Sequence, residues 1–368
     1  MKIGLVAMHS FPLPFSTHTG DIVILDLARS LKEIGHQVHL YAPEGSVCED
    51  IKVYPMPCSY GKFPPKGEDC EQQCFDDHKE TLMTEDIVHD FSVSKRIVEN
   101  LYKNGHKGII STIMGGPWTQ NIPPHNLIVW SDAHRDRVLR GATDYENTPT
   151  PDLAGPPKTP VKEAKVVYGG IDTNLYNPTY NKKDYILWMG RWSKVRGYIQ
   201  AIEIAKANPN VKFIFSGGMP EHEYFEQEKN CALEAIELIK NISNIELKLL
   251  PPGPDHHTFK IKLYQEAKAF LYNVQFNEPF GMMQAESLAC GTPVIGTNYG
   301  SIPEIVTNGI TGFVRQNTIE NLTTAIDMID MIKPEVCRNI AIQRFDRHVM
   351  AKSYLDKYND ILNSKGWS

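Results

Sequence analysis

Residues 277–305, NEPFGMMQAESLACGTPVIGTNYGSIPEI, carry the most chemistry-bearing positions of the chain. An Asn-Glu-Pro-Phe-Gly turn leads into a predicted helix, whose N-terminus would offer backbone N–H groups and the positive end of its dipole to an anion. Glu278 stands in the turn, where its carboxylate can accept hydrogen bonds from sugar hydroxyls. Glu286 follows about two turns into the helix. Two glutamates at this spacing are more often solvated, but the adjoining PFG, ACGTPV and Gly300 favour a site.

Basic side chains gather in two short stretches of a chain that is acidic as a whole. The chain has 38 Lys and Arg against 44 Asp and Glu, a formal net charge of -6. A field of that sign gives no general attraction to nucleic acid or anionic lipid, so no nucleic-acid partner is expected. The basic residues of the two stretches are Arg135, Arg137, Arg140, Arg191, Lys194 and Arg196.

Seven cysteines, an odd number, suit free thiols in a reducing compartment. Four of them lie near one another and near a histidine in the sequence: Cys48, Cys58, Cys70, Cys74 and His78. On a helix the last three would share one face and could hold zinc. The spacing is loose and segment 59–74 reads as an irregular insertion, so ordinary thiols are favoured and metal binding stays open.

The sequence indicates a cytoplasmic location. No apolar run reaches the roughly 18 residues that a membrane span needs. The opening MKIGLVAMHS leads into Pro12 and Pro14 without a cleavage-like site, so it is interpreted as a first strand. The helix predicted at 21–36 has few cations on its polar face, which makes peripheral membrane contact the weaker expectation.

Strand and helix patterns alternate through both halves of the chain. At 368 residues and 41.6 kDa, it suits two domains of roughly 100–200 residues each. In the first half, strands are expected at 2–8, 37–43, 107–115 and 126–132, with helices at 21–36 and 86–105. In the second half, strands are expected at 164–170, 185–192, 211–218, 245–251, 267–273, 292–298 and 312–316, with helices at 281–291, 320–333 and 348–363.

This alternation predicts an α/β fold built from parallel β-α-β units in two doubly wound, Rossmann-like domains. Ligands of such open sheets bind in the crevice at the carboxyl ends of the strands. Two such domains would place their carboxyl-end crevices facing each other.

The motifs, taken in order, resemble the signature of family 4 retaining glycosyltransferases of the GT-B fold. The family pattern E-x-F-G-(x)4-E followed by A-x-G-x-P-V is matched by Glu278 to Glu286 and by ACGTPV. The G-R-L-x-x-x-K-G motif is matched by GRWSKVRG at 190–197, and a Gly/Asp linker before N-P by VYGGID at 167–172 and Asn177-Pro178. A glycine pair near the family's N-terminus is matched by Thr19-Gly20-Asp21.

The resemblance spans nearly the whole chain, strongly over 165–315 and loosely over 45–165. It implies two GT-B domains that face each other across a cleft. Residues 1–165 would form an N-terminal, acceptor-side domain, and 166–345 a C-terminal domain that binds a nucleotide sugar. Residues 346–368 would form a helix that crosses back to the N-domain.

The same resemblance implies roles for individual residues. Arg191 and Arg196 would clamp the donor diphosphate, Glu278 would bind sugar hydroxyls, and Glu286 would bind ribose. The family usually has Lys where Arg196 stands, and Lys194 is close enough to substitute. Further donor-binding positions are glycines and backbone groups: Gly20, Gly190, Gly217, Phe280, Gly281, Met282 and Met283. Gly20 would let the first loop approach the phosphate.

The sequence departs from the family at a histidine that ends an N-domain strand and contacts the donor sugar. The corresponding stretch is VWSDAH at 129–134. Strict alignment places Ser131 or Asp132 at the position, with His134 two or three residues later. Asp132 and His134 are both retained as catalytic candidates, and which of these three side chains contacts the sugar is left open.

The implied activity is transfer of a hexose from a UDP- or GDP-sugar to an acceptor hydroxyl with retention of configuration. No carboxylate pair is placed as hydrolysis would require, and no D-x-D motif ends a strand, so neither a metal nor another cofactor is expected. The acceptor could be a glycan, a lipid-linked molecule or a small molecule. Residues 135–140 and the Pro-rich loop 148–160 could meet an acidic acceptor, or form a solvated basic turn.

Two other functions would share this architecture. A nucleotide-sugar 2-epimerase would need further acid and base residues, and a non-catalytic protein that binds sugar nucleotides would have the same donor site. An NAD-dependent oxidoreductase is excluded because no G-x-G-x-x-G follows the first strand.

Overall fold

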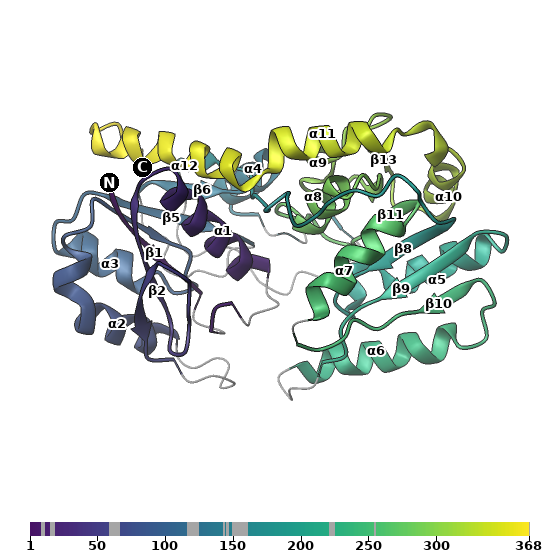
Figure 1. Cartoon of the computed structure of the whole chain (residues 1–368), viewed down its shortest axis with the longest axis horizontal. Coiled ribbons are helices and arrows are strands. Elements are labelled where there is room, and N and C mark those ends of the chain that lie inside the picture. The colour runs from purple at the N-terminus through teal and green to yellow at the C-terminus, as the bar shows by residue number, and fades with distance from the viewer. Residues whose placement is uncertain are drawn as a thin grey trace. The chain divides into compact units, whose positions relative to one another are not determined.

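The structure, a computed structural model, describes residues 1–8, 12–14, 19–58, 67–115, 125–142, 144, 147–148, 161–220, 225–253 and 255–367. The chain forms two compact units, which are shown in Figure 1. Unit 1 comprises Met1–Asp144, Asp152–Ile171 and Arg347–Ser368, and unit 2 comprises Tyr145–Pro151 and Asp172–Asp346. The first unit therefore continues past the expected boundary at 165, and the last segment of the chain returns to it.

Unit 1 is built on a seven-stranded sheet in the order β3-β2-β1-β4-β5-β6-β7, with parallel pairing throughout. Its strands are β1 (Lys2–Val6), β2 (Gln37–Pro43), β3 (Lys52–Met56), β4 (Ile87–Asp90), β5 (Ile109–Ile113), β6 (Leu127–Val129) and β7 (Lys165–Val166). Its helices are α1 (Thr19–Glu33), α2 (Gly67–Leu82), α3 (Arg96–Lys103), α4 (Asp132–Arg140) and α12 (Arg347–Leu362). The central strands are apolar because both faces of the sheet are covered.

Unit 2 has a six-stranded parallel sheet in the order β10-β9-β8-β11-β12-β13. Its strands are β8 (Tyr185–Met189), β9 (Lys212–Ser216), β10 (Ile245–Leu247), β11 (Ala269–Tyr272), β12 (Val294–Thr297) and β13 (Gly312–Arg315). Its helical segments are η1 (Lys194–Arg196), α5 (Tyr198–Ala207), α6 (Glu226–Ile239), α7 (Asp255–Glu266), α8 (Met282–Ala289), α9 (Ile302–Ile305), α10 (Ile319–Asp327), η3 (Ile329–Met331) and α11 (Pro334–Phe345). The expected α/β fold with two doubly wound sheets is confirmed.

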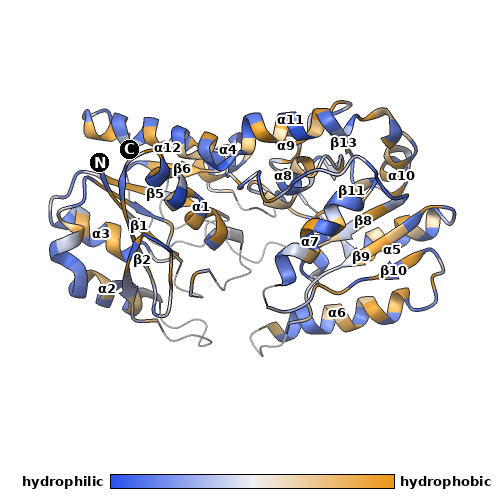
Figure 2. Ribbon diagram, viewed as in Figure 1, coloured by the Kyte–Doolittle hydropathy of each residue, from blue (hydrophilic) through white to orange (hydrophobic). Residues whose placement is uncertain are grey.

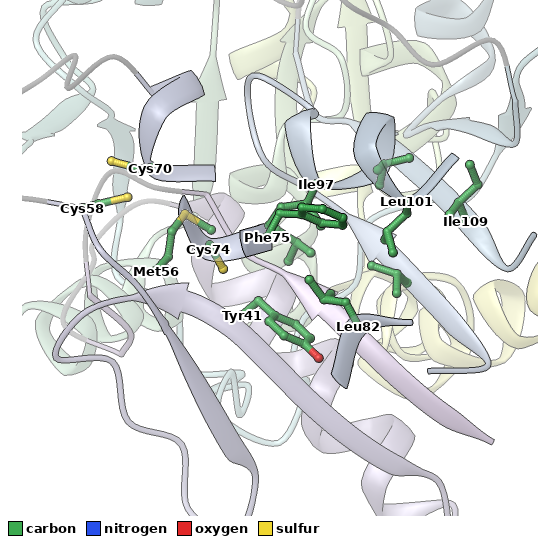
Figure 3. Packing of buried hydrophobic residues seen from close by; sticks show 13 residues of the cluster. Tyr41, Met56, Cys58, Cys70, Cys74, Phe75, Leu82, Ile97, Leu101 and Ile109 are labelled. Carbon is green, nitrogen blue, oxygen red and sulfur yellow. The ribbon is translucent and has the colours of Figure 1, made fainter. Parts of the chain in front are cut away.

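The hydropathy of the residues differs between the strands of the two sheets and the helices. Figure 2 shows hydrophobic residues along the strands of both sheets and mixed colours along helices such as α6 and α12. In unit 1, α2 and α3 bury one cluster against the sheet, which includes Tyr41, Phe75, Leu82 and Leu101 (Figure 3). Within the described part of the chain, no helix is long and apolar enough to cross a membrane.

Three local predictions are wrong. The helix expected at 86–105 is a strand, β4, followed by the shorter helix α3. Segment 59–74, interpreted as an irregular insertion, contains the first half of α2, and Cys70 and Cys74 of this half belong to the apolar cluster on the sheet. The helix expected at 320–333 ends at Asp327, and η3 follows before α11 begins at Pro334.

Candidate active site

The carboxyl ends of four neighbouring strands of unit 2 carry most of the predicted donor-site residues. Strand β8 leads into Gly190 and η1, β9 into Gly217, β11 into the turn that contains Glu278, and β12 into Gly300. These strands are parallel and adjacent, so their ends share one edge of the sheet. The structure thus gathers segments that are about 110 residues apart in the chain.

Arg196 and Glu278 form the central contact at this edge. The Arg196 Nη1 atom donates to Glu278 Oε2 at 2.9 Å and to the Tyr272 hydroxyl at 3.1 Å, and that hydroxyl also donates to Glu278 Oε2. The Arg196 guanidinium lies 4.9 Å from the centre of the Phe276 ring. Both charged side chains are largely buried, with exposed fractions of 20% and 9%. The pair is therefore a fixed feature of the edge.

The Glu278 carboxylate stabilises the charged form of Arg196. Burial alone would lower the pKa of Arg196, but Glu278 and Tyr272 outweigh it and raise that pKa above its ordinary value. Burial and the Glu278 carboxylate raise the pKa of Tyr272. Tyr272 therefore stays a neutral donor and Arg196 a permanent cation. All side-chain hydrogen bonds of the pair within the described residues use Arg196 Nη1 and Glu278 Oε2, which leaves Arg196 Nη2 and Nε and Glu278 Oε1 for a ligand.

Backbone contacts from the end of β11 position Arg196. The Gln275 N–H donates to the Val195 carbonyl at 2.7 Å, and Asn273 Nδ2 donates to the Gly197 carbonyl at 2.8 Å. Gly197 has a φ of 82°, and a Cβ there would lie 2.2 Å from the Asn273 carbonyl oxygen. The turn that follows η1 therefore needs glycine. It aims Arg196 inward, whereas Lys194 at the other end of η1 is exposed.

The turn before α8 is fixed in the same way. Gly281 is the N-cap of α8 with a φ of 78°, and the Phe280 carbonyl accepts hydrogen bonds from Ser301 Oγ at 2.9 Å and Gln284 Nε2 at 3.1 Å. The Phe280 ring is buried against Phe345. Met282 and Met283 open the helix, so their N–H groups belong to its first turn. The predicted anion site thus has the helix N-terminus that it requires.

Glu286 lies inside unit 2 in a cluster of its own. Its Oε1 atom accepts hydrogen bonds from Lys260 Nζ at 2.8 Å and from the Tyr176 hydroxyl at 2.9 Å. Its side chain is only 4% exposed, and Oε2 has no hydrogen-bond partner among the residues that the structure describes. Burial would raise the pKa of Glu286, but Lys260 and Tyr176 outweigh it and lower that pKa. The carboxylate is therefore ionised.

The other candidates of unit 2 have different surroundings. Arg191 is 60% exposed and its Nη1 atom donates to Glu228 Oε1 on α6 at 3.0 Å, so it does not share the buried position of Arg196. Gly190 donates its N–H to the Ser216 carbonyl at 3.1 Å. A Cβ on Gly217 would lie 2.5 Å from the Gly190 carbonyl oxygen, so these two strand ends approach closely because Gly217 has no side chain.

The candidates Gly20, Ser131, Asp132 and His134 belong to unit 1. The atoms nearest to a Cβ on Gly20 would be the side-chain ends of Met114 and Met8, at 3.0 to 3.2 Å. Asp132 is 53% exposed and pairs with Arg135 at 2.8 Å. Ser131 caps α4 by accepting the N–H of His134 at 3.0 Å.

His134 itself is fully buried, and both ring nitrogens lack hydrogen-bond partners within the described ranges. Burial, with a smaller contribution from Arg137, lowers the pKa of His134 to about 3. The imidazole is therefore neutral at ordinary pH. Of the three side chains that were left open, Asp132 is the exposed one and His134 the inaccessible one.

The basic stretch of unit 1 is largely neutralised by neighbouring carboxylates. Arg137 is buried and donates from Nε and Nη2 to Asp144 Oδ1 at 3.2 and 3.1 Å, and Arg135 pairs with Asp132. This arrangement fits the solvated or structural interpretation of the stretch better than an acceptor patch. Residues 149–160 of the Pro-rich loop lie outside the described residues.

The cysteines near the N-terminus do not assemble into a metal site in the described chain. No group of three or more His, Cys, Asp or Glu side chains there could hold an ion. Cys58, Cys70 and Cys74 are free thiols in the apolar cluster of Figure 3, and Cys48 is half-buried. His78 Nε2 lies 3.0 Å from the Pro55 carbonyl oxygen. The interpretation as ordinary thiols fits this arrangement.

Sequence reasoning missed three residues of unit 2. Tyr272 is the last residue of β11, and its place at a strand end six residues before Glu278 was the available signal. Lys260 lies on α7 and Tyr176 between β7 and β8, and neither belongs to a motif. Both contact Glu286 only because the chain folds back.

Comparison with known proteins agrees with this geometry. The model of the family described as "Glycosyl transferases group 1" matches residues 176–341. An N-acetyl-alpha-D-glucosaminyl L-malate synthase of Bacillus anthracis is 24% identical, over 98% of this chain and 97% of its own length. Other curated relatives match over less than half of their own length.

Solved structures show the same fold. A glycosyltransferase involved in avilamycin A biosynthesis superposes with a TM-score of 0.70 at 21% identity, over 100% of this chain and 99% of its own. The Anabaena protein HepE, in complex with UDP and glucose, superposes with a TM-score of 0.68 at 15% identity, over 98% and 99%. The fold and the family match define a GT-B glycosyltransferase. The expected resemblance to glycosyltransferases of the family 4 type is confirmed.

Proposed function

We propose that this glycosyltransferase moves a hexose from a UDP- or GDP-sugar to an acceptor hydroxyl, with retention of configuration and without a metal cofactor. The observation that carries the proposal is the buried Arg196–Glu278 pair at the carboxyl edge of unit 2, beside the N-terminus of α8. A cation, a carboxylate and a helix N-terminus together suit a diphosphate joined to a sugar. The complex of HepE with UDP and glucose supports this donor class.

Arg196 would act on the leaving group. Its Nη1 is held by Glu278 and Tyr272, so the guanidinium plane is fixed and the remaining N–H groups can face the diphosphate. Fixed donors that meet developing negative charge lower the barrier to nucleotide departure without reorganisation. The N–H groups at the start of α8 would add to this effect. Positive charge from these groups would take the place of a metal ion at the diphosphate.

Glu278 would act on the sugar. Its Oε1 accepts no hydrogen bond within the described chain, so it can accept from a sugar hydroxyl while Oε2 stays bound to Arg196. The acceptor hydroxyl would attack on the face that the nucleotide leaves, and the leaving phosphate oxygen would take its proton. Retention follows from attack on that face. Glu278 orients the sugar in this scheme and carries no proton.

Arg191 would join the diphosphate only after it leaves Glu228. An exposed ion pair is worth less than about 1 kcal/mol, so a diphosphate can compete for this guanidinium at small cost. The glycine-lined edge at Gly190 and Gly217 would admit the nucleotide. Of the unit 1 candidates, Asp132 is exposed and can contact a ligand as the chain stands, whereas His134 can do so only after it is uncovered.

The test is slow donor hydrolysis without an acceptor. UDP-glucose and GDP-mannose are incubated with the protein in EDTA or in Mg²⁺, and proton NMR identifies the first anomer released. We expect one donor to give the retained anomer at the same rate in both buffers. Glu278→Gln and Arg196→Met should abolish release, and Lys212→Met, at the opposite edge of the same sheet, should leave it unchanged.

Release of the inverted anomer first, or release that requires Mg²⁺, would overturn the corresponding part of the proposal. A wild-type protein that binds a donor and never turns it over with any acceptor would favour the non-catalytic alternative.

A further inference from the structure

We infer that Lys260 and Tyr176 are positioning residues that aim the Glu286 carboxylate at the ribose of the bound nucleotide. This inference rests on the proposed function, which places the nucleotide at this edge of unit 2. Lys260 lies on α7, Tyr176 lies in the segment before β8, and Glu286 lies on α8. Three segments from separate parts of the chain thus converge on one carboxylate.

The hydrogen bonds of this cluster reach only one of the two carboxylate oxygens of Glu286. Lys260 Nζ and the Tyr176 hydroxyl both donate to Oε1 of Glu286, at 2.8 and 2.9 Å. Tyr176 is buried, and its ring also meets His257 at 5.5 Å between centroids and Lys260 Nζ at 5.9 Å. The two donors occupy the acceptor sites of Oε1 and hold the carboxylate plane. They place nothing on the other oxygen.

Glu286 Oε2 is buried and has no hydrogen-bond partner within the described ranges. Burial, and after it the neighbouring Glu286 carboxylate, raise the pKa of Tyr264, whose buried hydroxyl lies close to Glu286 and also has no hydrogen-bond partner within the described ranges. Buried carboxylate oxygens are normally satisfied, because an unmade bond leaves the cost of desolvation uncompensated. A pair of ligand hydroxyls would satisfy this oxygen. A ribose is the part of a nucleotide that offers two adjacent hydroxyls.

The charge state of the cluster suits this role. Lys260 and Tyr176 keep Glu286 ionised against the effect of burial, so it can only accept hydrogen bonds. Burial and Lys260 lower the pKa values of His256 and His257, which makes both imidazoles neutral at ordinary pH. Cys290, with a pKa raised to about 12, is neutral as well. Lys260 is therefore the cation that sets the state of Glu286.

The test measures discrimination of hydroxyls. Calorimetry gives the Kd of UDP, 2′-deoxy-UDP and 3′-deoxy-UDP, and of the matching GDP set, for wild type and variants. The wild type should bind the ribonucleotide roughly tenfold or more tightly than at least one deoxy analogue, as expected for a bond to a charged acceptor. In Lys260→Met and Tyr176→Phe this ratio should fall towards one, through weaker binding of the ribonucleotide alone. Lys260→Arg should restore part of it.

Lys182→Met is the matched control. Lys182 is a second partly buried lysine of unit 2, and it donates to the Gln265 and Cys290 carbonyls and to Thr292 Oγ1. Its loss should weaken the fold, and with it the binding of all the nucleotides equally, so the ratio stays that of wild type. Tyr176→Phe removes one hydroxyl only and keeps the test open if Lys260→Met does not fold.

Two failures can be told apart through Glu286→Gln. If this variant loses the discrimination while Lys260→Met and Tyr176→Phe keep it, Glu286 binds ribose and the inference about its supporting residues is wrong. If Glu286→Gln keeps the discrimination, the ribose role of Glu286 is itself wrong, and the inference falls with it. If no nucleotide binds the wild type, the proposed function has failed.

Discussion

Arg191 and Arg196 belong to one sequence motif, but they have different surroundings at the edge of unit 2. Arg196 is largely buried against Glu278, and Arg191 is exposed beside Glu228. Removing one partner of a buried pair leaves an uncompensated charge, while an exposed pair contributes little. The two positions therefore predict very different effects on stability.

Arg196→Met should lower the free energy of unfolding by about 3 kcal/mol, because Glu278 then stays buried with Tyr272 as the one side-chain donor that the described residues provide. Arg191→Met should lower it by less than about 1 kcal/mol. Urea unfolding followed by circular dichroism measures both values. Equal effects of the two changes would show that the burial of Arg196 does not matter to stability.

His134 makes stability depend on pH. Its pKa in the folded chain is about 3, below the ordinary value of 6.5, so unfolding takes up a proton between these two pH values. The stabilisation that its neutral form provides is therefore lost as the pH falls from 6.5. Between pH 6.5 and 4.5, wild type should lose about 2 kcal/mol more than His134→Gln in urea unfolding. Parallel losses would contradict the buried neutral state.

At the residue scale, the sequence indicated in which elements the two glutamates lie but not which side chains they contact. Glu278 and Glu286 belong to a spaced motif, and both lie in the expected parts of unit 2. Neither the exposure of Arg191 nor the contact of Lys260 could be predicted, because each depends on a side chain from another segment. Glu228 on α6 and Glu286 on α8 supply those contacts only after folding.

At the scale of elements, the turn before α8 depends on a glycine. Gly281 has a φ of 78°, and a Cβ there would lie 2.4 Å from Gln284 Nε2 and 3.0 Å from Glu278 Cγ. Gly253 has a φ of 77°, and no atom of the described residues lies within 4 Å of its Cβ position. Both positions would strain the backbone of an alanine, but only position 281 would also crowd its Cβ. Alanine substitutions at the two glycines therefore separate the effect of backbone strain from that of crowding.

Gly281→Ala should cost about 1 to 2 kcal/mol more than Gly253→Ala, since only the first must also displace Gln284 and Glu278. Thermal unfolding compares the two, and donor affinity should fall only in Gly281→Ala. A Tm for Gly253→Ala at or below that of Gly281→Ala would mean that strain alone decides.

The elements that sequence reasoning missed share a physical cause. Segment 86–105 begins with four buried strand residues, Ile87 to Asp90, but the next buried positions, Ile97, Val98 and Leu101, extend a helical pattern backwards over them. Helix α2 is mostly polar, and few of its residues, such as Phe75 and Leu82, pack on the sheet. Long strands with continuous apolar runs, such as β8, were predictable because both their faces are buried.

At the scale of the whole molecule, the last segment of the chain belongs to unit 1. Arg347 donates to Ser30 Oγ at 3.0 Å and to Glu33 Oε1 at 2.9 Å, which ties α12 to α1. Trp367 follows α12, and its indole Nε1 donates to the Leu127 carbonyl at 3.0 Å. The Lys165 ammonium lies 4.2 Å from that ring. Unit 1 therefore depends on residues that follow unit 2 in the sequence.

Trp367→Ala should destabilise unit 1 by about 3 kcal/mol, because it removes a buried indole and its hydrogen bond to β6. Leu362→Ala, at the exposed end of α12, should have little effect. Hydrogen exchange resolves the two units, and only amides of unit 1 should lose protection in Trp367→Ala. Loss of protection in unit 2 as well would show that the units unfold together.

The central claim is that Arg196 and Glu278 form the part of unit 2 that binds diphosphate and sugar. The most direct measurement is calorimetric binding of UDP and UDP-glucose, and of GDP and GDP-mannose, to wild type, Arg196→Met and Glu278→Gln. We predict that Arg196→Met weakens both the nucleotide and the nucleotide sugar by roughly tenfold or more, while Glu278→Gln removes only the extra affinity that the sugar provides. Wild-type affinities in both variants would contradict the claim.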